Sequence, residues 1–146
     1  MKWFWKTFQK NFLLDKIKSR EAVIGIVGLG YIGLPTAALL SNKGFKVHGV
    51  DIKKSVIKTV NSGDIHIVEP DLDKYVKKAV ENKYLNASLT PCNADIFIIA
   101  VPTPFHEGYI PNINYIISAT KMIAPFVRDE NMIILESTSP VGTTEK

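Results

Sequence analysis

The sequence predicts an α/β fold built on a doubly wound, mostly parallel sheet, and three observations predict it. Apolar runs rich in β-branched residues recur at 23–27, 45–50, 95–101 and 131–135, separated by segments whose apolar residues have helical spacing. The third run is apolar throughout after Asp95, as in a strand with both faces covered. Glycines or polar side chains follow the runs directly, where a parallel sheet forms its ligand crevice. Helices on both faces and right-handed crossovers are therefore expected.

The composition narrows the class of protein. With 146 residues the chain has the length of one domain, and its 46% apolar and 22% charged residues are typical of a soluble globular protein. The net charge of +4 is modest and lies largely in the first twenty residues, so nucleic-acid binding is not expected. Cys92 is the only cysteine, which excludes an internal disulfide, and no metal-site spacing of Cys and His is present. With no apolar run of about 18 residues and no secretory signal, a reducing cytoplasm is the expected compartment.

Residues 1–21 form a separate segment, expected to be an amphipathic helix ahead of a single domain at 22–146. Aromatic side chains share one side of its helical wheel and lysines share the other. They are Phe4, Trp5, Phe8 and Phe12, and Lys2, Lys6 and Lys10. Such a helix can lie on an anionic membrane surface, or it can dock its aromatic face on its own domain or on a partner subunit. Leu13, Leu14 and Ile17 lengthen the apolar surface and break the clean division, which favours docking.

The first strand runs directly into a Gly-x-Gly-x-x-Gly sequence at residues 28–33, called the glycine turn below. Gly28 allows a tight turn, and Gly30 lets a pyrophosphate approach the backbone without a Cβ in the way. Gly33 lets the following helix pack closely on the strand. The N-terminus of that helix directs unpaired N–H groups at the phosphates.

The second strand ends in Asp51, which follows Gly28 by 23 residues, close to the spacing of about 20 that the dinucleotide fingerprint requires. In this context the glycine turn predicts a Rossmann-type dinucleotide-binding domain. The Asp51 carboxylate is suited to accept hydrogen bonds from the adenosine ribose and would repel a ribose 2′-phosphate, so NAD is expected rather than NADP. Lys53 and Lys54, just beyond it, soften that preference.

Four helices are expected between the strands, over 31–42, 55–61, 71–80 and 114–125. Asp71 is expected to cap the third helix, and Asn112 or Asn114 the fourth. His66 and Glu69, in the loop before the third helix, have the chemistry of an acid–base pair. Neither has a metal-ligand partner at helical spacing, so we interpret them as non-catalytic residues of a loop that borders the site.

Hydroxyl side chains follow the last two predicted strands. Thr103 lies between Pro102 and Pro104 and is a candidate contact to the cofactor. Ser137 and Thr138 follow the last strand in the same way and suit a polar ligand at the crevice.

Several stretches together resemble the N-terminal NAD-binding domain of the UDP-glucose/GDP-mannose dehydrogenase family. They are 28–35, 50–52, 101–104 and 136–138, with 65–72 and 135–142 beside them. The resemblance covers everything from Ala22 onwards and implies NAD as the cofactor. It implies an enzyme that oxidises the 6-hydroxyl of a UDP-sugar to a carboxylate in two NAD-dependent steps, through a thioester on a cysteine, for surface polysaccharides.

The resemblance also assigns residues. It implies Gly28, Gly30, Tyr31 and Ile32 at the pyrophosphate, Asp51 on the ribose, and Thr103 and Ser137 near the cofactor. Thr138 resembles a threonine that helps hold a catalytic water. The nucleophilic cysteine and the other catalytic residues of the family are expected beyond Lys146, and Cys92 does not match the nucleophile's motif. The chain alone is therefore expected to bind NAD without oxidising the sugar; the alternative is a free-standing NAD-binding or interaction module, and a homo-oligomer is left open.

Overall fold

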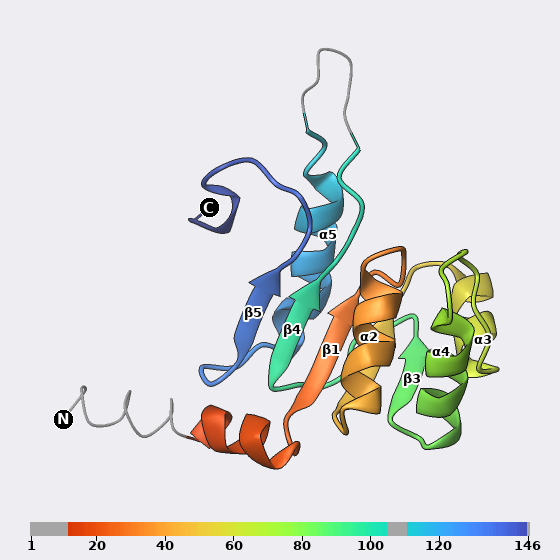
Figure 1. The fold of residues 1–146 in the computed structure, drawn as a ribbon. Helices are drawn as coiled ribbons and strands as arrows, with labels where there is room; N and C mark the ends of the chain where they lie inside the picture. The colour runs from red at the N-terminus through yellow and green to blue at the C-terminus, as the bar shows by residue number, and fades with distance from the viewer. Residues whose placement is uncertain (1–11, 105–110, 146) are drawn as a thin grey trace.

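The structure, a computed structural model, describes residues 12–104 and 111–145. Within them a five-stranded sheet has the order β3-β2-β1-β4-β5, and all of its pairings are parallel (Figure 1). The strands are β1 (Val23–Val27), β2 (Lys46–Val50), β3 (Leu85–Ser88), β4 (Ile96–Ile99) and β5 (Met132–Leu135). The α/β fold with a parallel sheet is confirmed.

Helices lie on both faces of this sheet, as predicted (Figure 1). On one face are α2 (Gly33–Asn42), α3 (Lys54–Asn61) and α4 (Leu72–Glu81); on the other is α5 (Asn114–Ile123), continued by η1 (Ala124–Phe126). A last short helix, η2, spans Thr143–Glu145. Residues 89–95 make the crossover from β3 to β4 without a helix.

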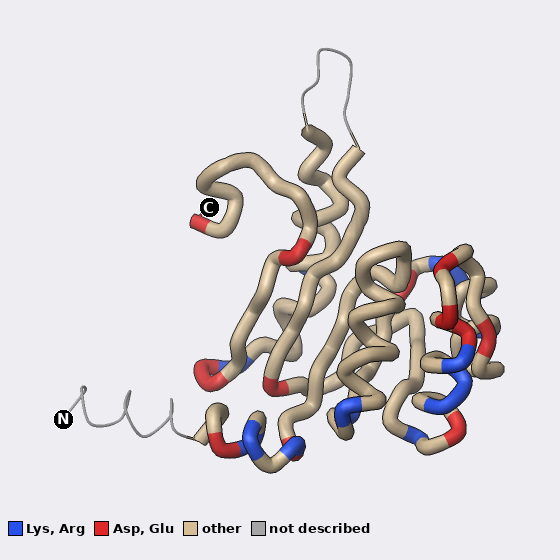
Figure 2. Tube along the Cα trace, viewed as in Figure 1, with Lys and Arg blue, Asp and Glu red and all other residues tan. Residues whose placement is uncertain are grey.

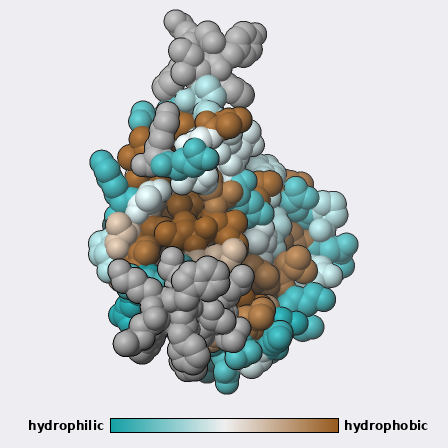
Figure 3. Space-filling model, turned by 90° about the vertical axis from the view of Figure 1, so that its left-hand side faces the viewer, coloured by the Kyte–Doolittle hydropathy of each residue, from teal (hydrophilic) through white to brown (hydrophobic). Residues whose placement is uncertain are grey.

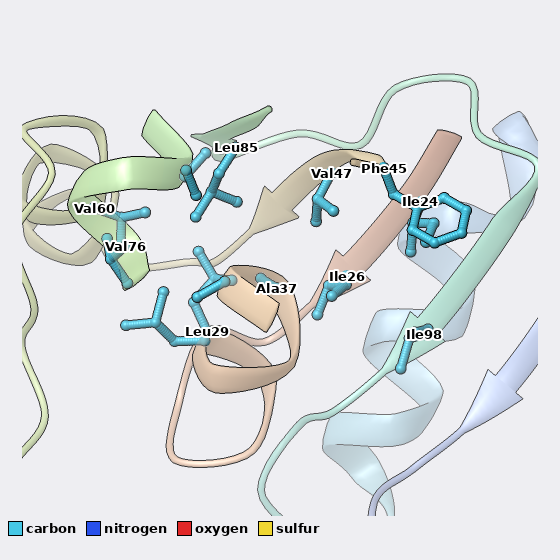
Figure 4. Packing of buried hydrophobic residues seen from close by; sticks show 14 of the residues in the cluster. Ile24, Ile26, Leu29, Ala37, Phe45, Val47, Val60, Val76, Leu85 and Ile98 are labelled. Carbon is cyan, nitrogen blue, oxygen red and sulfur yellow. The ribbon is translucent and has the colours of Figure 1, made fainter. Parts of the chain in front are cut away.

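Alternation along the strands divides the core into two layers. On β1, Ile24 and Ile26 face the α2 side, whereas Val27 faces α5. Leu29 of the glycine turn is fully buried in the α2-side cluster (Figure 4). A Cβ on Gly49 of β2 would lie 2.8 Å from the Leu29 side chain, so the glycine leaves the space that Leu29 fills. The glycine turn is therefore anchored in the core by its own leucine.

A helix at residues 12–19 precedes the sheet. Its Leu13 and Ile17 pack against the α2-side core, which agrees with the docking interpretation for this part of the segment. The Lys16 ammonium lies 2.7 Å from Asp95 Oδ1, and Asp95 Oδ2 accepts a hydrogen bond from Val23 N at 2.8 Å. One carboxylate thus joins the helix to the first residue of β1 and to the start of β4. The aromatic residues and lysines predicted at 2–10 lie outside the described residues.

None of the helices in the described ranges is long and apolar enough to cross a membrane.

The sequence-based expectations were wrong or incomplete at three points. Asp71 makes no side-chain cap to α4: its backbone is left-handed, with φ at 59°, and its carboxylate accepts a 2.6 Å hydrogen bond from Lys74 Nζ instead. At α5 the N-cap residue is Ile113 and no side chain caps the helix, so neither asparagine is the expected cap; the Asn112 side-chain oxygen accepts the Asn114 N–H at 3.0 Å. Strand β3 was not expected at all.

The two edges of the sheet differ. On β3, the Asn61 side-chain amide pairs with both backbone groups of Ala87, each at 2.8 Å, as a neighbouring strand would. In the described residues β5 pairs with β4 alone, and Met132 and Ile133 are both 47% exposed. The face seen in Figure 3, which is the side of the molecule where β5 lies in Figure 1, carries an apolar area.

Candidate nucleotide site

A cavity of about 830 Å³ opens at the carboxyl ends of β1, β2 and β4. The glycine turn, the segment after β2, the loop residue His66 and helix α5 form its walls. Its lining residues include Gly28, Gly30, Tyr31, Ile32, Asp51, Lys53, Val56, His66, Val101, Tyr115, Ser118, Ala119 and Met122. In a doubly wound sheet this edge is where ligands bind.

Gly28 and Gly33 are required by the protein's own packing. Gly28 has a φ of +95°, and a Cβ there would lie 2.6 Å from the Ala100 carbonyl oxygen. Its N–H donates to Val50 O at 2.8 Å, which ties the turn to the end of β2. A Cβ on Gly33 would lie 1.7 Å from Gly28 O, so α2 can start this close to β1 only with glycine.

Gly30 is different, because the fold itself does not require a glycine there. A Cβ at this position would have no neighbour within 4 Å, and its φ lies outside the left-handed range. Gly30 lines the cavity, so the space in front of its backbone belongs to the ligand. A pyrophosphate can contact backbone N–H groups only where it can come close to the backbone, and a Cβ at this position would narrow that space.

Asp51 is held in one orientation by backbone donors. Its Oδ2 accepts Leu29 N at 3.1 Å, and its Oδ1 accepts Lys53 N at 3.0 Å. The carboxylate thereby joins the glycine turn to the segment after β2. Each oxygen keeps a further acceptor position, so the group can still accept the two hydroxyls of a ribose.

The remaining walls are largely apolar. Tyr31, Ile32 and Ile52 are 62%, 56% and 71% exposed around the cavity, a high exposure for side chains of this size. Tyr115, Ala119 and Met122, all from α5, also line the cavity. Apolar walls with few polar groups suit a planar aromatic ligand such as a nucleobase.

Thr103, Ser137 and Thr138 do not line this cavity. The Ser137 hydroxyl donates to Val101 O at 2.7 Å, and so fastens the segment after β5 to the segment after β4. Thr138 is exposed on the neighbouring stretch. Their predicted contacts to the cofactor remain predictions.

Sequence reasoning missed part of the wall. His66 does border the cavity, as expected for its loop. From the sequence, Lys53 is marked only by its charge, and the α5 residues only by their helical spacing. The spacing of Tyr115, Ser118 and Met122, three and four residues apart, is the signal that could have identified one α5 face.

Cys92 is not among the lining residues. Burial raises the pKa of its thiol, the opposite of what an activated nucleophile requires. In the described parts of the chain, no group of three or more His, Cys, Asp or Glu side chains could hold a metal ion.

A parallel sheet in the order 3-2-1-4-5, a glycine turn whose middle glycine faces an open cavity, and an acid at the end of β2 define a Rossmann-type dinucleotide-binding domain. Residues 22–146 match the NAD binding domain of the UDP-glucose/GDP-mannose dehydrogenase family. The chain belongs to this family, and its cofactor is NAD.

The chain is similar to known nucleotide-sugar dehydrogenases in sequence and in structure. The chain is 54% identical over 125 residues to the UDP-N-acetyl-D-mannosamine dehydrogenase of Escherichia coli K12, covering 86% of this chain and 30% of that enzyme. It is 52% identical over 123 residues to the NDP-N-acetyl-D-galactosaminuronic acid dehydrogenase of Ralstonia nicotianae, covering 84% and 29%. The structure of the UDP-N-acetyl-mannosamine dehydrogenase of Staphylococcus aureus superposes with a TM-score of 0.83 at 38% identity, covering 86% and 31%. The chain thus spans about 30% of the length of these relatives.

Proposed function

We propose that this chain supplies the NAD site of a UDP-sugar 6-dehydrogenase acting on UDP-N-acetyl-D-mannosamine. The whole enzyme would oxidise the sugar 6-hydroxyl to a carboxylate in two steps, each of which passes a hydride to NAD. The similarity to UDP-N-acetyl-D-mannosamine dehydrogenases over residues 22–146 supports this substrate. The cytoplasm is the proposed compartment, and a homo-oligomer is the proposed assembly.

The observation that carries the cofactor role is the open space in front of Gly30, beside the fixed carboxylate of Asp51. In this proposal the pyrophosphate lies against residues 28–32, with Gly33 setting the position of α2. Asp51 accepts the adenosine ribose hydroxyls, and the apolar side chain of Ile52 lies beside the adenine. Thr103, Ser137 and Thr138 act farther along the cofactor, with Thr138 helping to hold the water that attacks the thioester.

This chain's own residues bind and orient NAD in the proposal, and they do not carry the covalent step. Cys92 does not line the cavity, and burial raises the pKa of its thiol, so it is not the nucleophile. The 146-residue chain is therefore expected to bind NAD and to leave UDP-N-acetyl-D-mannosamine unchanged.

Isothermal titration of the purified chain with NAD and with NADP tests the cofactor role. NAD should bind more tightly than NADP, and Asp51→Ala should weaken NAD; equal affinity for the two cofactors would contradict the assigned role of Asp51. NADH formation with the UDP-sugar is the second measurement. Sustained turnover by the 146-residue chain would show that it carries a complete catalytic site.

A further inference from the structure

Two side chains with cationic forms line the same cavity as Asp51. Lys53 follows the carboxylate by two residues, and His66 reaches the cavity from the loop between α3 and α4. The Asp51 carboxylate accepts a hydrogen bond from the backbone N–H of Lys53, not from its ammonium. In the part of the chain that the structure describes, the ion pairs are Lys16–Asp95 and Lys74–Asp71, so the Lys53 ammonium has no carboxylate within 4.0 Å there.

Helix stability does not explain a lysine at this point. Lys53 is the N-cap residue of α3 and Lys54 is its first residue, where the helix dipole disfavours positive charge. The cap has no side-chain hydrogen bond, and the first turn contains no acidic residue to offset the lysines. Charged residues are frequent on α3 and α4 (Figure 2), but of the lysines in the described residues only Lys53 lines the cavity.

The position of these groups corresponds to one part of the cofactor. When Asp51 accepts the ribose hydroxyls, the residues immediately beyond it are the ones nearest the 2′ oxygen. In domains of this kind, a cationic side chain near the acid position accommodates a 2′-phosphate. Lys53 and His66 supply that chemistry, and Asp51 opposes it.

We infer, on the basis of the proposed NAD site, that Lys53 and His66 form a cationic subsite for a phosphate on the adenosine 2′ oxygen, from which the Asp51 carboxylate alone excludes NADP. A 2′-phosphate brings a charge of about −1.5 to −2 and three acceptor oxygens. Beside the Asp51 carboxylate that charge is repelled, whereas without the carboxylate it meets the Lys53 ammonium and a ring N–H of His66. In this inference Asp51 alone gives the preference for NAD, and Lys53 and His66 favour NADP once the Asp51 charge is removed.

Titration calorimetry of four variants with NADP tests this inference. Asp51→Asn removes the charge and keeps an oxygen that can accept one of the two backbone N–H groups, so it tests the subsite even if Asp51→Ala disturbs the glycine turn. Asp51→Asn should bind NADP at least about tenfold more tightly than the wild type, the factor of one charge-assisted hydrogen bond. Adding Lys53→Met or His66→Gln to Asp51→Asn should each weaken NADP binding at least about threefold. Each loss is smaller than the gain because the two side chains share the contact with the phosphate.

Lys54→Met in the Asp51→Asn background is the matched control. It removes the same charge from the next residue, which does not line the cavity, and should leave most of the gained NADP affinity. The 2′ position is probed separately with 2′-AMP and 5′-AMP, and only 2′-AMP should gain affinity in Asp51→Asn.

The outcomes separate this inference from the proposed function. If the wild type binds NAD and Asp51→Asn gains no affinity for NADP, the subsite is refuted while the NAD site stands. If Lys53→Met and Lys54→Met lower NADP affinity equally, the effect is general charge and the subsite is refuted as well. If the wild type does not bind NAD, the proposed function fails first.

Discussion

Replacing Gly30 by alanine should separate ligand binding from folding in the glycine turn. The new methyl group would have no protein atom within 4 Å, and the backbone is not in the left-handed region. Its cost to the free energy of unfolding should therefore stay within about 0.5 kcal/mol, as for an exposed substitution. The methyl group would instead enter the cavity, where the pyrophosphate is expected to approach the backbone.

The loss of NAD affinity follows from that displacement. A phosphate that cannot approach the turn loses at least one hydrogen bond from a backbone N–H to a charged oxygen, about 1.5–3 kcal/mol. At about 1.4 kcal/mol for each factor of ten, Gly30→Ala should weaken NAD by roughly 10- to 150-fold. Titration calorimetry measures the affinity, and urea unfolding of the same sample measures the stability.

Gly33→Ala is the matched control, because the same methyl group would lie 1.7 Å from Gly28 O. That contact must displace α2 from β1, so Gly33→Ala should lose several kcal/mol of stability or fail to fold. The reasoning is refuted if Gly30→Ala binds NAD as the wild type does, or if its stability falls as far as that of Gly33→Ala.

Three further predictions concern stability and reactivity. Asp95→Ala should lower the free energy of unfolding in urea by about 2 kcal/mol and Lys16→Met by 1 kcal/mol or less, because the carboxylate also accepts a backbone N–H, whereas the lysine makes a partly exposed ion pair and a cation–π contact with Phe12; equal losses would contradict this division. Asn61→Ala should cost about 2 kcal/mol by urea unfolding, since both groups of Ala87 lose their partner, and an unchanged unfolding midpoint would count against the pairing. Burial raises the pKa of the Cys92 thiol, so its alkylation by iodoacetamide near neutral pH should be slower than that of free cysteine. The rate should increase as the pH rises through the ordinary thiol range. A faster rate than that of free cysteine at neutral pH would overturn this prediction.

The features that the sequence predicted well are those with a strong local signature. The apolar runs before Gly28 and Asp51 are buried parallel strands, and the spacing of these two residues brings them to one cavity. Strand β3 was missed because Leu85–Ser88 is short and partly polar and contains no β-branched residue. It forms a strand because β2 and the Asn61 side chain pair with it on its two sides, a tertiary effect that no local pattern encodes.

The wrong cap at α4 has an equally specific cause. Asp71 has the composition of a cap, but its left-handed backbone turns the carboxylate away from the first turn of α4 and toward Lys74. The hydrogen bond from the Ser137 hydroxyl to the carbonyl of Val101 is a contact that the sequence does not reveal, because the two residues are distant along the chain. The predicted contact of Ser137 with the cofactor stays a prediction.

The difference between the two edges of the sheet bears on self-association. Strands with free edges can add neighbours, and a sheet that is free at both edges can grow without limit into fibres. Here the Asn61 amide closes the β3 edge, and within the described residues the apolar strand β5 is the edge that can still accept a strand. A single side-chain amide thus removes one of the two positions at which this sheet could add a strand.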